Sequence, residues 1–374
     1  MKSIIFIVNV DWFFKSHRLP LALEAIKRNY KVIIITEDTG FFKYFKDLGF
    51  VCHNLKFGRG FGSPVVELLN FIKLYRIIRI YNADVIHNIT LKPYLYGSFI
   101  AKIQNKKGVI VNSITGLGYL YTNTKQLFLS GLIKKLLWFA LRNNEKLHFI
   151  FQNSSDMTFF QNIIHIPTKN FSIIKGAGVD ENVFKRETLV HTDNNLIKIV
   201  LVARMLRDKG VFEFINAAKL LRDDLYGKAE FILVGAIDEF NPSKISEFEL
   251  KELLEDSYIT WIGHTSHIKE IYDSCDIACL PSYREGLPKS LVEAMAMSCP
   301  IVTTDTPGCN DCVEHGKNGF LVPVGDYESL ANRILILCQS QELRVEMGKA
   351  SRLKMIDEMS LNKVIDATFK TYEG

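Results

Sequence analysis

Short runs of β-branched and aromatic residues alternate with helix-length segments along the whole chain. In the first half, these runs lie at 3–10, 31–37, 84–89, 108–114, 148–153 and 171–176. In the second half, they lie at 197–204, 229–235, 258–263, 276–282 and 300–305. Apolar strands that alternate with helices are typical of parallel sheets covered on both faces. The pattern therefore predicts an α/β fold with two doubly wound parallel sheets.

The length supports two domains, because 374 residues exceed what a single core usually organises. The polar stretch RETLVHTDNNL predicts a linker at 186–196. We expect an N-terminal Rossmann-like domain at 1–185, a second one at 197–355, and a C-terminal helix at 356–374 that crosses back to the first domain. Ligands of such sheets bind at the carboxyl ends of the strands, so we expect the domains to face each other across a cleft.

The composition is that of a globular protein, with 48% hydrophobic and 23% charged residues. Seven scattered cysteines argue against a disulfide framework and favour a reducing compartment. No apolar run reaches the roughly 18 residues that a membrane span needs. The opening MKSIIFIVNV lacks a small-residue cleavage site and is better explained as a first strand. These observations predict a cytoplasmic protein.

Charge is unevenly distributed between the two halves. Residues 1–190 contain 26 Lys and Arg against 12 Asp and Glu, whereas the remainder contains 20 against 29. A basic half indicates a polyanionic partner, and an anionic membrane surface and a nucleic acid both fit that description.

Two segments of the basic half are amphipathic. They are 67–81, with Lys73, Arg76 and Arg79, and 127–143, with Lys134, Lys135, Trp138 and Arg142. A basic amphipathic helix with an aromatic residue is suited to a membrane interface. We interpret the first segment as a core-packed helix with a solvated basic edge. The wide apolar arc of the second leaves a core helix and a membrane-surface helix equally open.

The stretch ARMLRDKG at 203–210 places cations where an α/β sheet binds anions. Arg204 ends a buried strand, Lys209 follows in the same loop, and a helix is predicted to begin near Gly210. The N–H groups and the dipole of a helix N-terminus add to such side-chain charges. The stretch is a candidate diphosphate site, and the alternative is an ordinary exposed Arg–Lys pair.

The stretch SYREGLPKSLVEAMAMSCP at 282–300 has the features of a second half of that site. Pro288 suits the first helical position, with Lys289 in the first turn. Glu293 then lies about one and a half turns into the helix, where its two oxygens can accept hydrogen bonds from both hydroxyls of a ribose. Glu285, before the turn, can reach hydroxyls beyond the phosphates. The order predicts a ligand built as ribose, diphosphate and sugar.

These motifs resemble the retaining glycosyltransferases of family 4, which have two Rossmann-like domains in the GT-B fold. The resemblance covers essentially the whole chain. In the second half it rests on GVDENVF (178–184), ARMLRDKG (203–210), LVGAIDEFNP (233–242), LPSYREGLP (280–288), the E-x7-E spacing of EGLPKSLVE (285–293) and PIVTTDTPGC (300–309). In the first half, SHRLPLA (16–22), TLKPYLYGS (90–98), SITGLGY (113–119) and FQNSSD (151–156) are similar to bacterial enzymes that extend undecaprenyl-diphosphate-linked sugars in O-antigen, capsule or glycoprotein-glycan assembly.

The resemblance implies a role for each matching residue. Arg204 and Lys209 would bind the donor diphosphate and stabilise the leaving group, while Glu285 would contact the donor sugar. Glu293 would hold the ribose. The other implied donor contacts are Gly286, Leu287, Pro288, Lys289 and Ser290 near the phosphates and His264 near the base. The implied activity is hexosyl transfer, with an N-acetylhexosamine or a hexose moved from UDP to the lipid-linked glycan.

No Asp-x-Asp metal motif occurs in the sequence. We therefore expect neither a metal nor a cofactor, with fixed cations stabilising the departing nucleoside diphosphate. The family implies retention of anomeric configuration, and the sequence offers no obvious nucleophile. The expected partners are a nucleotide-sugar donor, a lipid-linked glycan acceptor and an anionic membrane surface, with no nucleic acid. The expected location is the inner face of the cytoplasmic membrane.

The chain departs from the family pattern at two places. Ser298 stands where such chains usually carry Gly, and Cys309-Asn310-Asp311 stands where Cys-Arg-Glu is common. The second departure weakens any assignment of ligand contacts to that loop.

Acceptor-side candidates follow strands of the first half. They are Asp11, His17 and Arg18 after the first strand, Lys92 after the strand at 84–89, and Thr115, Gly116 and Gly118 in the loop TGLG. Glycines in that loop would let a backbone approach a ligand closely. Of the two histidines here, His17 is the catalytic candidate, and His87 is more typical of a packed strand residue.

Three motifs are better explained by ordinary structural roles than by cofactor or metal binding. The stretch FGRGFGSPVVELL (57–69) has G-x-G-x-G rather than dinucleotide-binding spacing and is better explained as a helix start at Ser63-Pro64. Cys309-x-x-Cys312 and His264-x-x-His267 each lack a second pair at metal-ligand spacing.

Two other functions compete with glycosyl transfer to a lipid. A GT-B-fold nucleotide-sugar epimerase or hydrolase would need no lipid acceptor and no interfacial helix. A nucleic-acid-binding module would use the basic half, but it needs basic and aromatic residues together on one exposed face. The sequence identifies neither the donor sugar nor the acceptor sugar, and it does not separate UDP from GDP.

Overall fold

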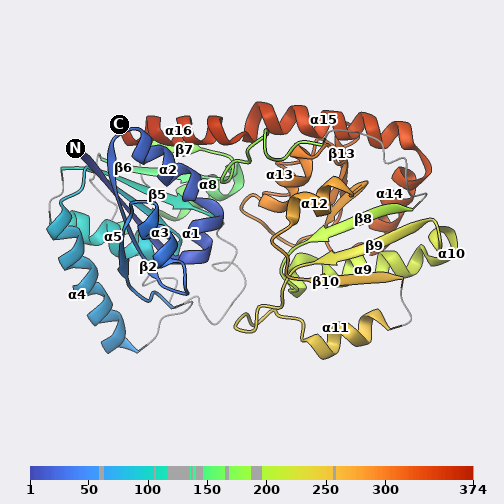
Figure 1. Ribbon diagram of the computed structural model, residues 1–374, viewed down its shortest axis with the longest axis horizontal. Helices are drawn as coiled ribbons and strands as arrows, with labels where there is room; N and C mark the ends of the chain where they lie inside the picture. Colours follow the sequence, from blue (N-terminus) through green and yellow to red (C-terminus); the bar gives the residue numbers. More distant parts are fainter. Residues whose placement is uncertain are drawn as a thin grey trace. The chain divides into compact units, whose positions relative to one another are not determined.

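The computed structural model describes residues 1–58, 63–104, 107–116, 135, 138–139, 146–164, 168–186, 196–255 and 258–373. The chain divides into two compact units, one formed by Met1–Ala177 with Val364–Gly374 and the other by Gly178–Lys363. Unit 1 contains a seven-stranded sheet and unit 2 a six-stranded sheet (Figure 1). Every strand pair in both sheets is parallel. The predicted α/β class with two doubly wound parallel sheets is confirmed.

Unit 1 has the strand order β3-β2-β1-β4-β5-β6-β7. Its strands are β1 (Lys2–Val10), β2 (Tyr30–Glu37), β3 (Val51–Asn54), β4 (Val85–Ile89), β5 (Val109–Ile114), β6 (Leu147–Phe151) and β7 (Phe171–Ile173). Its helices are α1 (Asp11–His17), α2 (Leu19–Lys27), α3 (Phe42–Asp47), α4 (Pro64–Tyr81), α5 (Leu91–Ile103), α8 (Ser154–Ile164) and α16 (Leu361–Glu373).

Both faces of strand β1 are covered, as its continuous apolar sequence requires. Phe6 makes a T-shaped ring contact with Phe14 of α1 at 5.7 Å between centroids. Ile5 and Ile7, which point to the opposite face, belong to a buried cluster with Leu74 of α4. Helices on both faces leave loops at the strand ends as the open part of the sheet.

The C-terminal helix α16 is anchored to unit 1 through His87 of β4. One ring nitrogen of His87 lies 2.6 Å from the hydroxyl of Tyr372 in α16, and the other lies 2.6 Å from Ser113 Oγ in β5. Burial lowers the pKa of His87 well below its ordinary value, and the Arg18 charge adds to this. His87 is therefore a neutral packed histidine, as the sequence predicts.

Unit 2 has the strand order β10-β9-β8-β11-β12-β13. Its strands are β8 (Ile197–Val202), β9 (Ala229–Val234), β10 (Ile259–Gly263), β11 (Ile277–Leu280), β12 (Ile301–Thr304) and β13 (Gly319–Val322). Its helices are α9 (Val211–Leu220), α10 (Arg222–Leu225), α11 (Glu247–Leu254), α12 (Ile268–Asp273), α13 (Lys289–Ala296), α14 (Tyr327–Gln339) and α15 (Gln341–Met359).

The sequence patterns miss three elements. Residues 11–17, expected as a strand-end loop, form helix α1, because Asp11 begins a helix directly after β1. Strands β3 and β13 have only four residues each and lie at sheet edges, where short segments carry little apolar signal. Of the expected linker at 186–196, residues 187–195 lie outside the described residues.

Ser298 has a backbone conformation that explains why a glycine is usual at its position. It follows α13 with a φ of 57°, in the left-handed region that costs a non-glycine residue about 1–2 kcal/mol. Its amide donates to Met295 O at 3.0 Å, so the conformation terminates the helix.

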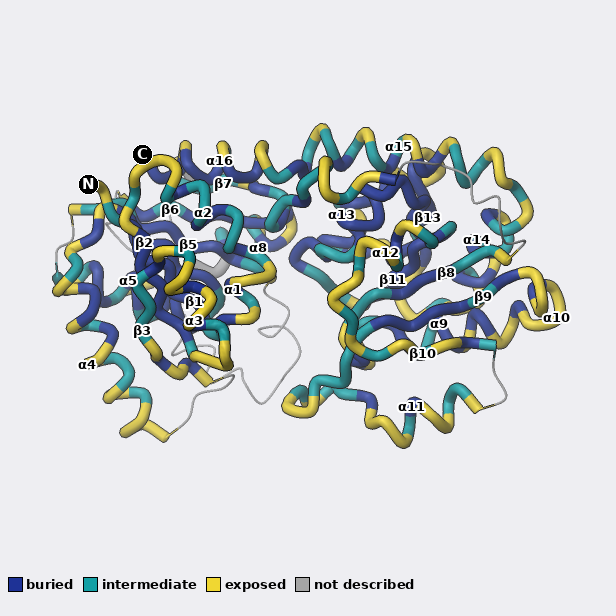
Figure 2. Tube along the Cα trace, viewed as in Figure 1, coloured by how far each residue is buried: buried dark blue, intermediate teal, exposed yellow. Residues whose placement is uncertain are grey.

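The fully buried side chains of helix α4 all lie in its second half. Leu74, Ile77 and Ile78 are buried, whereas Leu68 and Leu69 are about 60% exposed. In Figure 2, the start of α4 is coloured mostly as exposed. The expectation of a core-packed helix with a solvated edge therefore holds from Phe71 onward, whereas Leu68 and Leu69 at the start of the segment are exposed. Across the described part of the chain, no helix combines the length and the apolar character needed to cross a membrane.

Candidate active site

The loops after β8 and β11 meet at the point where the strand order of unit 2 reverses. From β8 the chain proceeds to β9 and β10 on one side, and β11 lies on the other side of β8. Such switch points open a crevice outside the carboxyl ends of the strands, where α/β sheets bind ligands. The backbone amide of Tyr283 donates to Asp208 O at 2.9 Å, and Ser282 Oγ donates to the same oxygen at 2.9 Å. The structure thus brings the two predicted halves of the site together.

Lys209 and Glu285 form an ion pair at this junction. Lys209 Nζ lies 2.5 Å from Glu285 Oε1, and both side chains are mostly buried, with 16% and 13% of their surfaces exposed. Ser282 Oγ lies 3.0 Å from the same carboxylate oxygen. The pair fixes a cation and an anion next to each other at the carboxyl ends of β8 and β11. It can exchange partners when a phosphate approaches the ammonium group.

Arg204 follows β8 and contacts a carboxylate from the next loop. Its Nη1 lies 2.5 Å from Oδ2 of Asp238, which follows β9. Arg204 is 45% exposed, whereas the side chain of Asp238 is 8% exposed. Sequence reasoning did not single out Asp238, and the available signal was its position in LVGAIDEFNP, directly after a predicted strand.

Helix α13 carries Glu293 at the depth that the sequence predicts. The helix begins at Lys289, with Pro288 as the residue before its first turn, one position earlier than expected for the proline. Glu293 is 8% exposed, and its Oε1 lies 3.0 Å from Lys289 Nζ. Burial raises the pKa of Glu293 above its ordinary value, despite the opposing effect of Lys289. A nearly buried carboxylate beside a helix start is suited to accept hydrogen bonds from a vicinal diol.

The loop after β12 supports the turn that carries Glu285 and Gly286. The amide of Glu285 donates to Pro307 O at 3.3 Å, and a Cβ on Gly308 would lie 2.5 Å from Gly286 O. Cys309 and Cys312 form no disulfide and are fully buried, and burial raises the pKa of Cys309 to about 11. Within the described ranges, no group of three or more His, Cys, Asp or Glu residues has the arrangement of a metal site.

The remaining donor-side candidates also follow the carboxyl ends of strands in the unit 2 sheet. Leu287 is buried and Ser290 half-buried, and Ser290 O accepts a 2.7 Å hydrogen bond from the buried Tyr272 hydroxyl. His264 follows β10 and is exposed. It is separated from β8 by β9, so its distance along the edge suits the base end of a nucleotide better than the phosphates.

Replacing Glu293 by Gln tests the assignment of the diol-binding carboxylate. We expect UDP affinity to fall about 10- to 100-fold, because hydrogen bonds to a charged group contribute about 1.5–3 kcal/mol. The melting temperature should stay level or rise, since Gln removes a charge that burial disfavours. Protonation of Glu293 removes the charge that binds the diol, so the UDP affinity of the wild type should fall as the pH is lowered. Because the pKa of Glu293 is raised above 4.5, this fall should begin at a higher pH than for an ordinary glutamate. The fall should be absent in Glu293→Gln.

Calorimetric titration with UDP at several pH values makes the measurement, with the exposed Glu252→Gln in α11 as a matched control. Equal UDP affinity in Glu293→Gln and the wild type would contradict the assignment.

In unit 1, Asp11 is a structural anchor. Its fully buried carboxylate accepts hydrogen bonds from the amides of Trp12 and Thr39 at 2.7 Å each and of Phe41 at 3.1 Å. It also accepts a hydrogen bond from the Thr39 hydroxyl. The contacts fasten the loop after β2 to the end of β1.

His17 and Arg18 lie at the junction of α1 and α2. The ring of His17 stacks on Phe13 at 4.2 Å between centroids. Arg18 is buried, and burial lowers the pKa of its guanidinium to about 10. Its Nη1 donates to His17 O at 3.3 Å. The two residues share a helix junction rather than an open loop.

Lys92 lies in the first turn of α5 and is already neutralised by the protein. Its buried Nζ contacts Glu67 Oε1 of α4 at 2.7 Å and Phe57 O at 3.1 Å. Thr115 is half-buried and Gly116 exposed after β5, with a φ of 127° at Gly116. Gly118 lies outside the described residues.

Thr90 is a residue that the sequence patterns did not reveal. It follows β4 with φ 75° and ψ 164°, a region that is essentially restricted to glycine. β4 neighbours β1 at the point where the strand order of unit 1 reverses. A strained backbone at a switch point is typical of functional sites, so Thr90 joins the acceptor-side candidates of unit 1.

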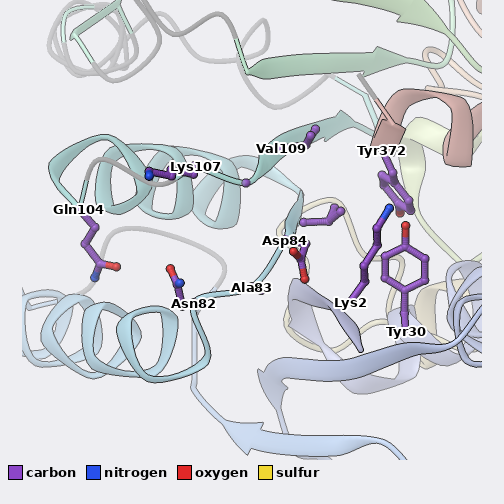
Figure 3. A pocket seen from close by; sticks show the side chains of 11 residues that line it. Lys2, Tyr30, Asn82, Ala83, Asp84, Gln104, Lys107, Val109 and Tyr372 are labelled. Carbon is purple, nitrogen blue, oxygen red and sulfur yellow. The ribbon is translucent and has the colours of Figure 1, made fainter.

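A pocket of about 570 Å³ lies at the amino ends of the strands in the unit 1 sheet (Figure 3). Its lining includes Lys2, Tyr30, Asp84 and Val109 at the beginnings of strands. Because ligands of parallel sheets bind at the carboxyl ends, this pocket does not belong to the candidate site.

Two protein families match the chain. Residues 3–153 match the family described as glycosyl transferase 4-like, and residues 184–354 match glycosyl transferases group 1. An N,N'-diacetylbacillosaminyl-diphospho-undecaprenol alpha-1,3-N-acetylgalactosaminyltransferase of Campylobacter jejuni is 29% identical, over 89% of this chain and 88% of its own. A UDP-Gal:alpha-D-GlcNAc-diphosphoundecaprenol alpha-1,3-galactosyltransferase of Escherichia coli is 23% identical, over 81% and 79%.

Solved structures share the fold over the full length. A glycosyltransferase of Rickettsia africae has a TM-score of 0.80 at 19% identity and covers 100% of this chain and 98% of its own. HepE of Anabaena in complex with UDP-glucose has a TM-score of 0.78 at 17% identity, with both chains fully covered. The chain belongs to the group 1 and 4-like glycosyltransferases, with the GT-B fold, as shown by the two family matches, the paired Rossmann-like sheets and the E-x7-E segment at the switch point.

Proposed function

We propose that the chain transfers a sugar from a UDP-sugar to a glycan linked to undecaprenyl diphosphate, with retention of anomeric configuration. The observation that carries the donor side is the switch point of unit 2, where Lys209 of the loop after β8 pairs with Glu285 of the loop after β11. Arg204 lies in the first of these loops, and Glu293 lies on the helix that follows the second. The acceptor class is supported by the names of the Campylobacter and Escherichia relatives. The product is a lengthened lipid-linked glycan in surface-glycan assembly.

The proposed mechanism is stabilisation of the leaving nucleoside diphosphate by fixed cations. As the sugar–oxygen bond breaks, negative charge grows on the diphosphate, and Lys209 and Arg204 are the cations beside it. The N–H groups at the start of α13 add partial positive charge. Glu293 orients the nucleoside through the ribose hydroxyls, and Glu285, released from Lys209 by the phosphate, accepts hydrogen bonds from the donor sugar. Cations held by the fold need little rearrangement during the reaction.

We propose that this reaction needs no metal ion, because two fixed cations perform the charge stabilisation and the sequence has no Asp-x-Asp motif. The purified protein should keep its rate in EDTA.

The acceptor side is proposed to be the carboxyl edge of the unit 1 sheet, where Thr90 and Thr115 follow adjacent strands. Lys92 is paired with Glu67, so recognition at this edge would rest on hydrogen bonds to uncharged sugar hydroxyls.

A panel of UDP- and GDP-sugars tests the proposed reaction. The purified protein is incubated with each donor, with and without a short polyprenyl-diphosphate-linked sugar, and release of nucleotide is measured. We expect UDP release that rises when the acceptor is added. Release of UDP that ignores the acceptor would favour the hydrolase or epimerase alternative, and inactivity with every donor would reject the proposal.

We further propose that the chain works at an anionic membrane surface. On α4, the exposed Val65, Leu68 and Leu69 precede the exposed basic residues Arg76 and Arg79 on the same helix. Apolar side chains followed by cations suit the boundary between acyl chains and anionic headgroups. Of the segment 127–143, the structure describes Lys135, Trp138 and Phe139, and all three are exposed.

Charge reversal on α4 tests the membrane proposal. The double variant Arg76→Glu/Arg79→Glu should bind anionic liposomes at least about tenfold more weakly, because each basic residue near such a surface contributes about 1 kcal/mol. The variant Leu68→Ser/Leu69→Ser should weaken binding to anionic and neutral liposomes alike. Lys251→Glu, on the exposed face of α11, serves as the control. Unchanged sedimentation of both α4 variants would refute the role of this helix.

A further inference from the structure

The loop that follows β9 lies along the candidate phosphate loop of unit 2. Met205 donates its amide to Ala236 O at 3.0 Å, and Ile245 donates to Met205 O at 3.0 Å. The amide of Arg207 donates to Ser243 O at 2.9 Å. Residues 236–245 therefore form a backbone support for the loop at 204–207. Neither the proposed mechanism nor the family resemblance gives this loop a role.

Asp238 is held in place within this supporting loop. Its carbonyl oxygen accepts a 2.9 Å hydrogen bond from the amide of Asn241, and Asn241 Oδ1 accepts one of 2.9 Å from the amide of Ser243. Its carboxylate is nearly buried at 8% exposure. A buried side chain on a hydrogen-bonded turn has little freedom, so the orientation of the Asp238–Arg204 pair is set from the Asp238 side.

Arg204 has the opposite character. It is 45% exposed, and its Nη1 meets Asp238 Oδ2 at 2.5 Å. In the described part of the chain, Nε and Nη2 of Arg204 have no hydrogen-bond partner. A guanidinium has five N–H donors in one plane, so fixing one nitrogen orients the others. The remaining N–H groups of Arg204 can donate hydrogen bonds to the oxygens of a diphosphate.

We propose that Asp238 is a positioning residue for the donor diphosphate, acting through Arg204; this inference rests on the proposed function. By holding Nη1, Asp238 restricts the long arginine side chain before the donor arrives, so less side-chain entropy is lost on binding. The carboxylate is paired with Nη1, which limits its repulsion of the phosphates. The alternative is that Asp238 competes with the donor diphosphate for Arg204 and must be displaced when the donor binds.

A double-mutant cycle separates these roles. Asp238→Ala, Asp238→Asn, Arg204→Ala and Asp238→Ala/Arg204→Ala are titrated with UDP, and their kcat and KM are measured with the active donor. We expect Asp238→Ala to weaken UDP binding about tenfold and to raise KM more than it lowers kcat. Asp238→Asn, which keeps an acceptor oxygen, should recover part of the loss. In the Arg204→Ala background, Asp238→Ala should have no further effect.

The matched control is Glu249→Ala. Glu249 pairs with Arg207 of the same loop at 2.6 Å, and removal of this exposed pair should leave UDP affinity unchanged. Tighter UDP binding by Asp238→Ala would overturn the proposal in favour of a competitor. An effect of equal size with and without Arg204 would overturn it in favour of a general structural role. If Arg204→Ala itself binds UDP like the wild type, the proposed donor site fails, and the inference fails with it.

Discussion

Lys209→Ala should lower kcat about 10²- to 10³-fold, the range observed when one preorganised group that stabilises transition-state charge is removed. Lys209 Nζ is held 2.5 Å from Glu285 at the reversal point of the unit 2 sheet, where a leaving diphosphate would find it. The measurement is steady-state release of UDP from the active donor. KM for the donor should rise less than kcat falls, because the charge on the leaving group grows during the reaction.

Loss of Lys209 also leaves Glu285 without its cation, which can destabilise the loop. The double variant Lys209→Ala/Glu285→Gln removes that unpaired charge, and melting temperatures separate unfolding from lost catalysis. Lys219→Ala, on the exposed end of α9, is the control. A rate for Lys209→Ala within twofold of the wild type would remove Lys209 from the mechanism.

Gly210→Ala should destabilise unit 2 and abolish donor binding. Gly210 has a φ of 73°, and a Cβ there would lie 2.1 Å from the backbone oxygen of Pro281. The left-handed conformation costs alanine about 1–2 kcal/mol, and overpacking against a fixed backbone adds about 1–3 kcal/mol. The clash would also separate the loop that carries Lys209 from the loop that carries Glu285. We expect a fall in melting temperature of about 10 °C.

Gly227→Ala is the matched control for this substitution. Gly227 has nearly the same φ, 74°, but no atom lies within 4 Å of the position of its Cβ. It should lose only about 3–6 °C and keep its activity, because it carries the backbone strain without the clash. Equal thermal shifts for the two variants would show that the contact between Gly210 and Pro281 contributes nothing. Thermal unfolding and UDP titration of both proteins make the comparison.

Several site residues could be predicted because their signal is local. Arg204 and Lys209 follow a long apolar strand, and the Gly-Leu-Pro turn before Lys289 has the composition of a helix start. Glu293 then falls at a fixed depth in the helix by spacing alone. The structure places each of these residues within one turn of its expected position.

Other features have no local signal. The strand β3 contains only Val51–Asn54, which is too short for a period of two to be visible. Lys92 looks like a free cation after a strand, and only the packing of α4 against α5 shows that Glu67 neutralises it. Thr90 has an ordinary sequence context, and its strained backbone arises from the turn between β4 and α5.

The sequence by itself determined the α/β class, the two sheets and the helix that carries Glu293. These depend on apolar periodicity and on turn residues, which act over a few neighbouring positions. Only the tertiary structure decided which carboxylate pairs with which cationic side chain. Lys209 meets Glu285 across 76 positions and Arg204 meets Asp238 across 34, because the strand order places the ends of β8, β9 and β11 side by side. Ion pairs act through space, and the distances they need are set by the sheet.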